Sequence, residues 1–325
     1  MAILCGVVAS IAFGTPARAQ TSAPRWPPAP EPARIRFVRS IDPAAVRGKP
    51  SVFSRIVRVL IGDREEPRMR QPYGVAVAAD GIVYVADTYG KAIHVYDLKK
   101  PSYRSIPVDG GSLIGVAIAG NRLFVTDSES GRLLALDLKG RVQWTVGPKQ
   151  GLLRPTGLVV AGDRLYVVDT LGHRVVVVTL AGAIAGSFGS RGSEAGQFNF
   201  PTNIASGADG RLYVTDAMNF RVQIFNRDGG VVRAFGQLGD GSGDFDKPKG
   251  IAVDSAGRVY VVEGLNDVVQ VFDDEGQLLL VFGGSGVRDG ELYLPSGIAI
   301  VNNMVYVADS ANRRVAMFEQ LRPTP

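Results

Sequence analysis

The sequence predicts an all-β fold, a six-bladed β-propeller of four-stranded blades, and two observations carry this prediction. Tight-turn dipeptides such as Asp80-Gly81 and Asp209-Gly210 recur between short apolar runs, and their residues tolerate the positive φ of hairpin turns. Short strands in units that repeat every 40 to 47 residues are typical of propeller blades. An acidic residue also ends a strand of Y-V-x-D type once in every 40 to 47 residues, at Asp87, Asp127, Asp169, Asp216, Glu263 and Asp309.

The fourth repeat shows the predicted unit clearly. Its inner strand begins at Pro201, and its second strand ends at Asp216. The third strand covers Arg221–Phe225 and the outer strand Val231–Phe235, with the Asp228-Gly229 turn between them. Successive side chains of a strand point to opposite faces, so we expect the third strand to alternate outward and inward side chains.

The two ends of the repeat array predict how the ring closes. The sixth unit ends soon after its third strand, at Phe318, and lacks an outer strand. Residues 34–41 form an alternating strand that has no blade of its own. We expect this strand to complete the last blade, because closure removes exposed sheet edges. The predicted propeller spans 34–320, with an insertion at 42–70 and a tail at 321–325.

The repeats resemble NHL repeats of the secreted bacterial type. The best-matching segments are FNFPTNIASGADGRLYVTDAMNFRVQIF (198–225) and LYLPSGIAIVNNMVYVADSANRRVAMF (292–318), and the resemblance covers about residues 71–318. The first two units diverge but keep the motif core at Tyr84–Asp87 and Phe124–Asp127. The resemblance implies a six-bladed propeller that presents its loops to other molecules.

The N-terminal residues predict export. Ala2 to Phe13 is a short apolar run, and Ala17-Arg18-Ala19 has the small-x-small form of a signal-peptidase site. We interpret 1–19 as a signal peptide, although no Lys or Arg precedes the run, and expect a periplasmic or extracellular location. Residues 20–33 are rich in proline and are predicted to be an extended linker. Trp26 within them is interpreted as part of that linker or as a docking element.

Charge and residue counts exclude several classes of function. The net charge of +5 comes from 36 basic and 31 acidic residues that are scattered along the chain, which argues against a nucleic-acid partner. Cys5 is the single cysteine and falls inside the signal. His94 and His173 are the two histidines, too few for a three-histidine zinc site. No segment is long enough to span a membrane, and we expect a monomer.

No cofactor is predicted, although neither calcium nor zinc is excluded. The segment Asp240–Asp246 places oxygen-bearing side chains at alternate positions, as calcium loops do. It lacks the distal glutamate that supplies two ligands in an EF-hand. The corresponding loops of other units share its glycines without its carboxylates, so an interblade connection is the preferred interpretation.

The six recurring acids are interpreted as structural brackets rather than as a metal ring. Each ends a strand, where its carboxylate can accept backbone N–H groups of the following loop. An arginine five residues later can pair with the acid in the same blade or the next one. These arginines are Arg132, Arg174, Arg221 and Arg314.

Six residues are predicted to face a ligand at the mouth of the central channel, because each precedes or replaces the inner-strand glycine. No cluster of Glu, Asp and Asn resembling the metal site of gluconolactonases is found among them, and no Ser-His-Asp triad is identifiable. Channel packing is the alternative interpretation. The candidates are Tyr73, Thr156, Thr202, Asn203, Lys249 and Ser296.

These observations favour a noncatalytic interaction scaffold that binds protein partners through loops on a rigid frame. The alternative is a metal-dependent enzyme of lactonase or lyase type with its site in the channel. The fold by itself does not distinguish the two.

Overall fold

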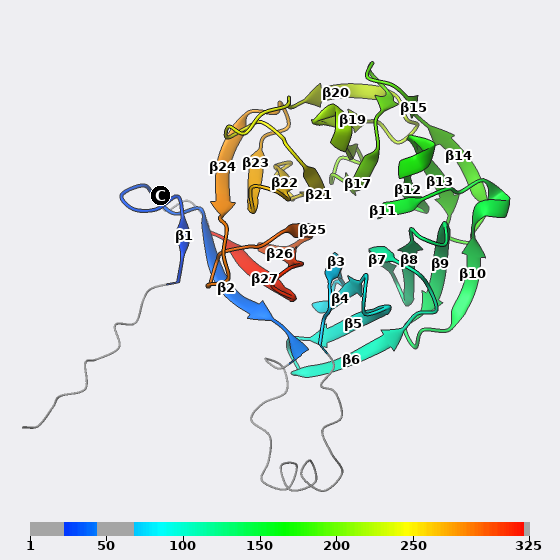
Figure 1. Cartoon of the computed structure of the whole chain (residues 1–325), viewed down its shortest axis with the longest axis horizontal. Coiled ribbons are helices and arrows are strands. Elements are labelled where there is room, and N and C mark those ends of the chain that lie inside the picture. Colours follow the sequence, from blue (N-terminus) through cyan, green and yellow to red (C-terminus); the bar gives the residue numbers. More distant parts are fainter. Residues whose placement is uncertain (1–22, 44–67, 322–325) are drawn as a thin grey trace, which may run out of the picture.

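The computed structural model, which describes residues 23–43 and 68–321, confirms the six-bladed propeller. Six antiparallel sheets surround a central axis, and the inner strand of each sheet lies nearest to that axis (Figure 1). The predicted segments 1–19, most of 42–70 and 322–325 lie outside the described residues. None of the described helices is long and apolar enough to cross a bilayer.

The blades follow one another along the chain, each running from its inner to its outer strand. The first is β3 (Pro72–Val77), β4 (Ile82–Asp87), β5 (Ala92–Asp97) and β6 (Ser102–Pro107), and the second is β7 (Leu113–Ala119), β8 (Arg122–Asp127), β9 (Arg132–Asp137) and β10 (Val142–Val146). The third is β11 (Pro155–Ala161), β12 (Arg164–Asp169), β13 (Arg174–Thr179) and β14 (Ile184–Phe188), and the fourth is β17 (Pro201–Ser206), β18 (Leu212–Asp216), β19 (Arg221–Phe225) and β20 (Val231–Phe235). The fifth is β21 (Pro248–Val253), β22 (Val259–Glu263), β23 (Val268–Phe272) and β24 (Leu278–Gly283), and the sixth begins with β25 (Pro295–Val301), β26 (Met304–Asp309) and β27 (Arg314–Gln320).

Short elements complete the connections. The strands β15 (Ser190–Arg191) and β16 (Gln197–Phe198) pair in parallel between the third and fourth blades. Three single-turn 3-10 helices lie at η1 (Pro148–Gln150), η2 (Thr170–Gly172) and η3 (Ala217–Asn219).

The middle strands are the core of the molecule. Every residue of β18 and β22 is buried, because each sheet packs against a neighbouring sheet on both sides. This explains why these strands are nearly continuous runs of valine, leucine and tyrosine instead of alternating with polar residues. The outer strand β14 is largely exposed, since only one of its edges is covered.

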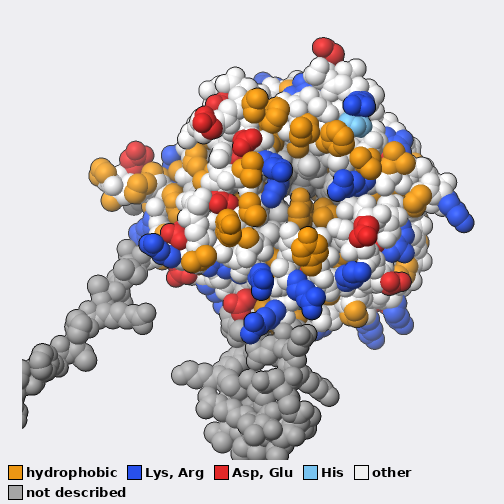
Figure 2. All heavy atoms as spheres, viewed as in Figure 1, with side chains coloured by type: hydrophobic (Ala, Val, Ile, Leu, Met, Phe, Trp, Pro, Cys, Tyr) orange, Lys and Arg blue, Asp and Glu red, His pale blue; other side chains and the backbone are white. Residues whose placement is uncertain are grey.

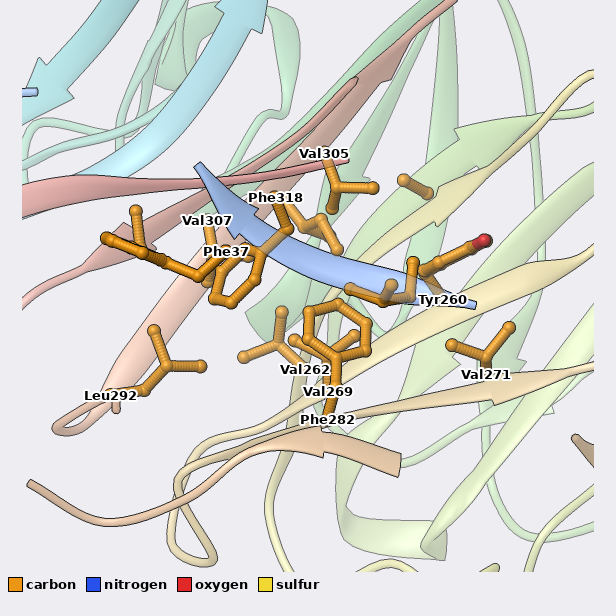
Figure 3. Packing of buried hydrophobic residues seen from close by; sticks show 14 residues of the cluster. Phe37, Tyr260, Val262, Val269, Val271, Phe282, Leu292, Val305, Val307 and Phe318 are labelled. Carbon is orange, nitrogen blue, oxygen red and sulfur yellow. The ribbon is translucent and has the colours of Figure 1, made fainter. Parts of the chain in front are cut away.

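The N-terminal strand closes the ring, as the sequence predicts. β2 (Ile35–Ile41) pairs antiparallel with β27 and takes the outer position of the sixth blade. Phe37 lies opposite Phe318, and their rings meet edge to face at 5.7 Å. Both pack into the cluster between the fifth and sixth blades together with Phe282 and Tyr260 (Figure 3).

Part of the expected linker belongs to this closure. Arg25–Trp26 forms β1, which pairs with β2, and the Trp26 ring lies 5.7 Å from Phe318 and 6.1 Å from Phe282. A proline-rich segment has little tendency to fold alone, but an indole ring removes a large apolar area from water when it finds an aromatic groove. Trp26 therefore joins the folded ring, whereas the sequence predicts a solvated linker or a docking element.

We expect Phe37→Ala to lower the free energy of unfolding by about 3 kcal/mol, because it removes a buried ring and leaves a cavity at the closure. Urea unfolding measures this change. Val38→Ala is the matched control, since Val38 lies on the same strand but is 41% exposed. Equal losses in the two variants would contradict a packed closure.

Candidate functional site

The propeller has two unlike faces, which the strand directions define. The inner strand of each blade begins, and the second strand ends, on one face, as the pairing of Pro72 with Asp87 illustrates. We call this the loop face, because it carries the interblade loops and the connections between second and third strands. The opposite face carries the short hairpin turns, such as the two-residue turn between Ala119 and Arg122, and we call it the turn face. The central channel joins the two.

The six recurring acids end the second strands at the loop face, and all are fully buried. Each accepts hydrogen bonds from backbone N–H groups of the loop that leads into the inner strand of its own blade. Asp216 accepts from Asn199 N–H at 2.7 Å, and Asp127 accepts from Ser112 N–H at 3.0 Å. The sequence predicts that the loop after each acid supplies these N–H groups. That loop does so in the first two blades, where Gly90 donates to Asp87 and Ser130 donates to Asp127.

The arginines pair with the acid of the same blade. The four distances run from 2.7 Å for Arg314 with Asp309 to 3.2 Å for Arg174 with Asp169. In the first blade His94 takes this place, and its Nε2 lies 3.0 Å from Asp87. Glu263 in the fifth blade is held by the N–H groups of Asp246 and Lys247. Each carboxylate thus ties a loop to a strand end within one blade.

The partners decide the charge state of these acids. Burial alone would raise the pKa of Asp127, but hydrogen bonds from the Ser112 backbone, Arg132 and Ser130 outweigh it and lower this pKa to about 2. Burial raises the pKa of Glu263 above its usual value, because the backbone N–H groups of Asp246 and Lys247 only partly offset the desolvation.

The predicted channel-mouth residues are brought together, and their side chains mostly bond the neighbouring blade. The Thr156 hydroxyl donates to the Thr202 carbonyl oxygen at 2.9 Å. The Ser296 hydroxyl donates to the Tyr73 carbonyl oxygen at 3.0 Å, across the junction between the last and first blades. The Lys249 ammonium donates to the Pro295 carbonyl oxygen at 3.2 Å.

The same arrangement occurs at all six junctions between blades, and the donor always lies in the preceding blade. Second-strand and loop residues supply the donors where the inner strand does not. The remaining contacts are Thr88 to the Leu113 carbonyl, Thr126 to the Thr156 carbonyl, and Thr215 to the Lys249 carbonyl.

The central channel encloses a cavity of about 370 Å³. Its lining comes from the inner strands of all six blades and consists almost entirely of glycine, alanine, valine, leucine and isoleucine. Asn203 and Ser206 are the two polar side chains among the described lining residues. The Asn203 side-chain oxygen accepts the Ile204 N–H at 2.8 Å. The described residues hold no group of three His, Cys, Asp or Glu placed to share a metal.

A second cavity of about 310 Å³ lies at the loop face, beside the mouth of the channel. Tyr73 and Lys249 line it together with Arg70, Tyr89 and Arg313, from the first, fifth and sixth blades. Burial, and then the neighbouring charge of Lys247, lowers the pKa of Lys249. Three basic side chains, those of Arg70, Lys249 and Arg313, line this one cavity.

The remaining candidates have local partners. His94 lies between Asp87 and the Tyr103 hydroxyl, 2.8 Å from the latter. His173 Nδ1 lies 3.1 Å from the Phe198 carbonyl oxygen. In the segment that resembles a calcium loop, Asp244 accepts a hydrogen bond from Gln237 at 2.8 Å.

Several exposed apolar residues of the loop face were not among the predicted site residues. Four lie two residues after a recurring acid, and three lie one or two residues before an inner-strand proline. Side chains at these loop positions are expected to be polar, so their apolar character is a signal that the sequence already carries. We call this set the apolar arc: Tyr89, Leu153, Leu171, Phe200, Met218, Leu265 and Leu294, with exposed fractions from 36% to 69%.

Comparison with known proteins supports the fold and leaves the activity open. The family model described as outer membrane protein assembly factor BamB matches residues 63–200, and one described as a 6-bladed beta-propeller matches residues 201–280. Neither match covers half of the chain. No curated protein sequence matches significantly.

Solved propellers superimpose on the chain at low identity. The catalytically inactive virginiamycin B lyase from Staphylococcus aureus with quinupristin has a TM-score of 0.60 and 14% identity, covering 78% of this chain and 96% of that one. A gluconolactonase from Xanthomonas campestris has 0.61 and 19%, covering 78% and 87%. An auxiliary nutrient binding protein from Bacteroides thetaiotaomicron has 0.61 and 10%, covering 78% and 70%. At these identities the similarity establishes a six-bladed β-propeller and nothing further about activity.

We expect Asp216→Ala to lower the free energy of unfolding by about 3 kcal/mol, because it removes the acceptor shared by the half-buried Arg221, the buried Gln223 and the Asn199 backbone N–H. Any change in the free energy of ligand binding should be smaller than this change in the free energy of unfolding. Denaturant unfolding and thermal melting measure the effect. The control is Asp228→Ala at an exposed turn; an unchanged melting temperature for Asp216→Ala would rule out the bracket role.

Asp127→Asn and Glu263→Gln should differ in their dependence on pH. Because the folded-state pKa of Asp127 is lowered, its stabilisation is present above its usual value near 3.8 and is lost as pH falls toward 2. The folded-state pKa of Glu263 is raised above its usual value of 4.5. Its ionised form therefore lowers the free energy of unfolding as pH rises above that value. Unfolding across pH 3 to 7 should show Asp127→Asn losing stability most at neutral pH and Glu263→Gln losing much less. Equal losses at pH 7 would disprove this difference.

Proposed function

We propose that this chain is a noncatalytic binding protein of the NHL-repeat type that engages a protein partner through the apolar arc of its loop face. The observation that carries the proposal is the arc itself. Five of the six blades contribute to it, and exposed apolar side chains gathered on one face of a protein mark an interaction site more often than single, scattered ones do. Viewed down the ring axis, hydrophobic and basic side chains lie round the central opening (Figure 2).

The turn face provides the contrast that selects the loop face. Some of its arginines pair with a carboxylate of the same turn, as in Arg141 with Asp137 at 2.6 Å and Arg258 with Asp254 at 2.7 Å, whereas the paired arginines of the loop face bind the buried acids that end the second strands. Paired charges at exposed turns favour solvation over docking. The two faces therefore differ in chemistry, and the loop face supplies the buried area that a partner needs.

The matched family model supports both the kind of partner and the location. Its description names an outer membrane protein assembly factor. Together with the signal-like residues 1–19, this favours export to the periplasm or cell exterior. Fractionation of cells that express the full chain tests the location.

The enzymatic alternative has less support from the channel. A metal-dependent lactonase or lyase needs carboxylate, amide or imidazole groups that converge on one point. The lining offers Asn203 and Ser206, and the Asn203 oxygen is already bonded to a backbone N–H. The lyase and gluconolactonase neighbours share the fold with this chain at 14% and 19% identity.

The experiment compares Met218→Ser/Leu265→Ser with Val231→Ser/Val232→Ser. All four residues are exposed, but the second pair lies on the outer strand β20 and away from the loop face. A polar group in the arc should desolvate poorly against a partner, so we expect the first variant to lose at least tenfold in retention of the proteins that wild type retains from an envelope fraction. Quantitative mass spectrometry of the eluates measures this retention.

Two results would reject the proposal. One is equal loss in both double variants, because the outer strand would then matter as much as the arc. The other is about one calcium or zinc ion per purified chain together with turnover of lactone or lyase substrates, which would favour the channel enzyme.

A further inference from the structure

The strongest unassigned feature is the 310 Å³ cavity at the loop-face mouth of the channel. It is built from three blades that closure of the ring brings together. Arg70 precedes the first inner strand, Lys249 lies on the fifth inner strand, and Arg313 lies in the last loop of the sixth blade. Tyr89 and Leu294, two residues of the apolar arc, line the same cavity.

The three cations of this cavity lack the carboxylate partners that other basic residues of the propeller have. None of the ion pairs among the described residues involves Arg70, Lys249 or Arg313. The nearby acids are committed to the backbone. Asp267 accepts the Leu294 N–H at 2.7 Å, and Glu263 accepts the N–H groups that precede its inner strand.

Lys249 is held in place at the edge of the channel. Its ammonium is oriented by the hydrogen bond to the Pro295 carbonyl oxygen, and its aliphatic stem packs beside Gly264, where an added Cβ would lie 2.4 Å from the stem. An anion beside this ammonium would offset the cost of keeping a charge half-buried. Two flanking guanidinium groups can each present two parallel N–H donors to a carboxylate.

We propose that this cavity binds a carboxylate of the partner, carried by an acidic side chain or a chain terminus with apolar neighbours. This inference rests on the proposed function and names the chemistry of the segment that the loop face recognises. The carboxylate lies among Arg70, Lys249 and Arg313, and the adjoining apolar side chains of the partner contact Tyr89 and Leu294.

The size and surroundings of the site favour a single carboxylate over a nucleic-acid backbone. A cavity of about 310 Å³ accommodates one or two side chains, whereas a phosphate backbone needs a basic stripe that follows it. The second blade places Glu129, an exposed acid, on the same face. It would repel a polyanion that crossed the face.

The test uses fluorescence anisotropy with three labelled hexapeptides at low ionic strength. The first alternates leucine and glutamate and has an amidated C-terminus. The second replaces glutamate with glutamine and keeps the amide, and the third is the glutamine peptide with a free C-terminal carboxylate. Wild type should bind at least one carboxylate peptide tenfold more tightly than the amidated glutamine peptide, and the preferred peptide distinguishes a side chain from a chain terminus.

Variants locate the site. Arg70→Gln/Arg313→Gln should weaken binding of the preferred peptide at least tenfold, because both residues are exposed and their substitution leaves the interblade hydrogen bonds intact. Lys99→Gln/Lys139→Gln removes the same charge from exposed turns on the turn face and should leave affinity within twofold. Lys249→Gln gives an independent variant, with its melting temperature reporting any structural loss.

Equal affinity for all three peptides, or equal loss in the loop-face and turn-face charge variants, would overturn the inference. Its failure can be told apart from failure of the proposed function. If Arg70→Gln/Arg313→Gln retains the envelope partner while Met218→Ser/Leu265→Ser loses it, the apolar arc binds a partner and the carboxylate assignment is wrong.

Discussion

The hydrogen bonds that join each blade to the next at the channel mouth are the constraint on which the rest of the structure depends. A hydroxyl or ammonium group of one blade donates to a main-chain carbonyl at the start of the next inner strand, at every junction round the ring. A propeller blade buries both faces of its middle strands only when its neighbours lie at the correct distance. These polar contacts set that distance, and the apolar clusters between blades supply most of the stabilisation.

Inner-strand glycines allow this close approach. A Cβ at Gly297 would lie 2.3 Å from the Tyr73 carbonyl oxygen, and one at Gly115 would lie 2.4 Å from the Thr156 carbonyl oxygen. A side chain there would push the blades apart. In the fourth blade Asn203 stands at this position, and Gly157 of the preceding blade makes room for it. The hydroxyl groups at the channel mouth are therefore committed to the ring, and the channel beyond them is lined almost entirely by apolar side chains.

This commitment determines where recognition can occur. Hydroxyl groups already bonded to a neighbouring blade are poor partners for a ligand, because binding would exchange one hydrogen bond for another with little net gain, whereas the Lys249 ammonium has two N–H donors beyond the one it gives to the Pro295 carbonyl oxygen. The exposed apolar side chains of the loops that the recurring acids hold in place do not take part in these bonds between blades. Buried carboxylates such as Asp216 and Asp309 accept a backbone N–H of the preceding loop and a side-chain amide N–H of an asparagine in the following loop. Exposed apolar side chains such as Met218 are consequently presented on a rigid support, which limits the entropy lost on binding.

The sequence by itself determined the repeat, the six blades and the closing strand, since strand periodicity, turn dipeptides and the recurring acids are local patterns written along the chain. It also singled out six candidate residues beside the inner-strand glycines. Only the tertiary structure decided what those residues do, because the partner of Thr156 or Ser296 belongs to the next blade and lies 46 or 223 residues away in sequence. The placing of Trp26 against Phe282 and Phe318 and the gathering of Arg70, Lys249 and Arg313 in one cavity have the same cause. Ring closure brings segments from opposite ends of the chain together, and no local pattern encodes that proximity.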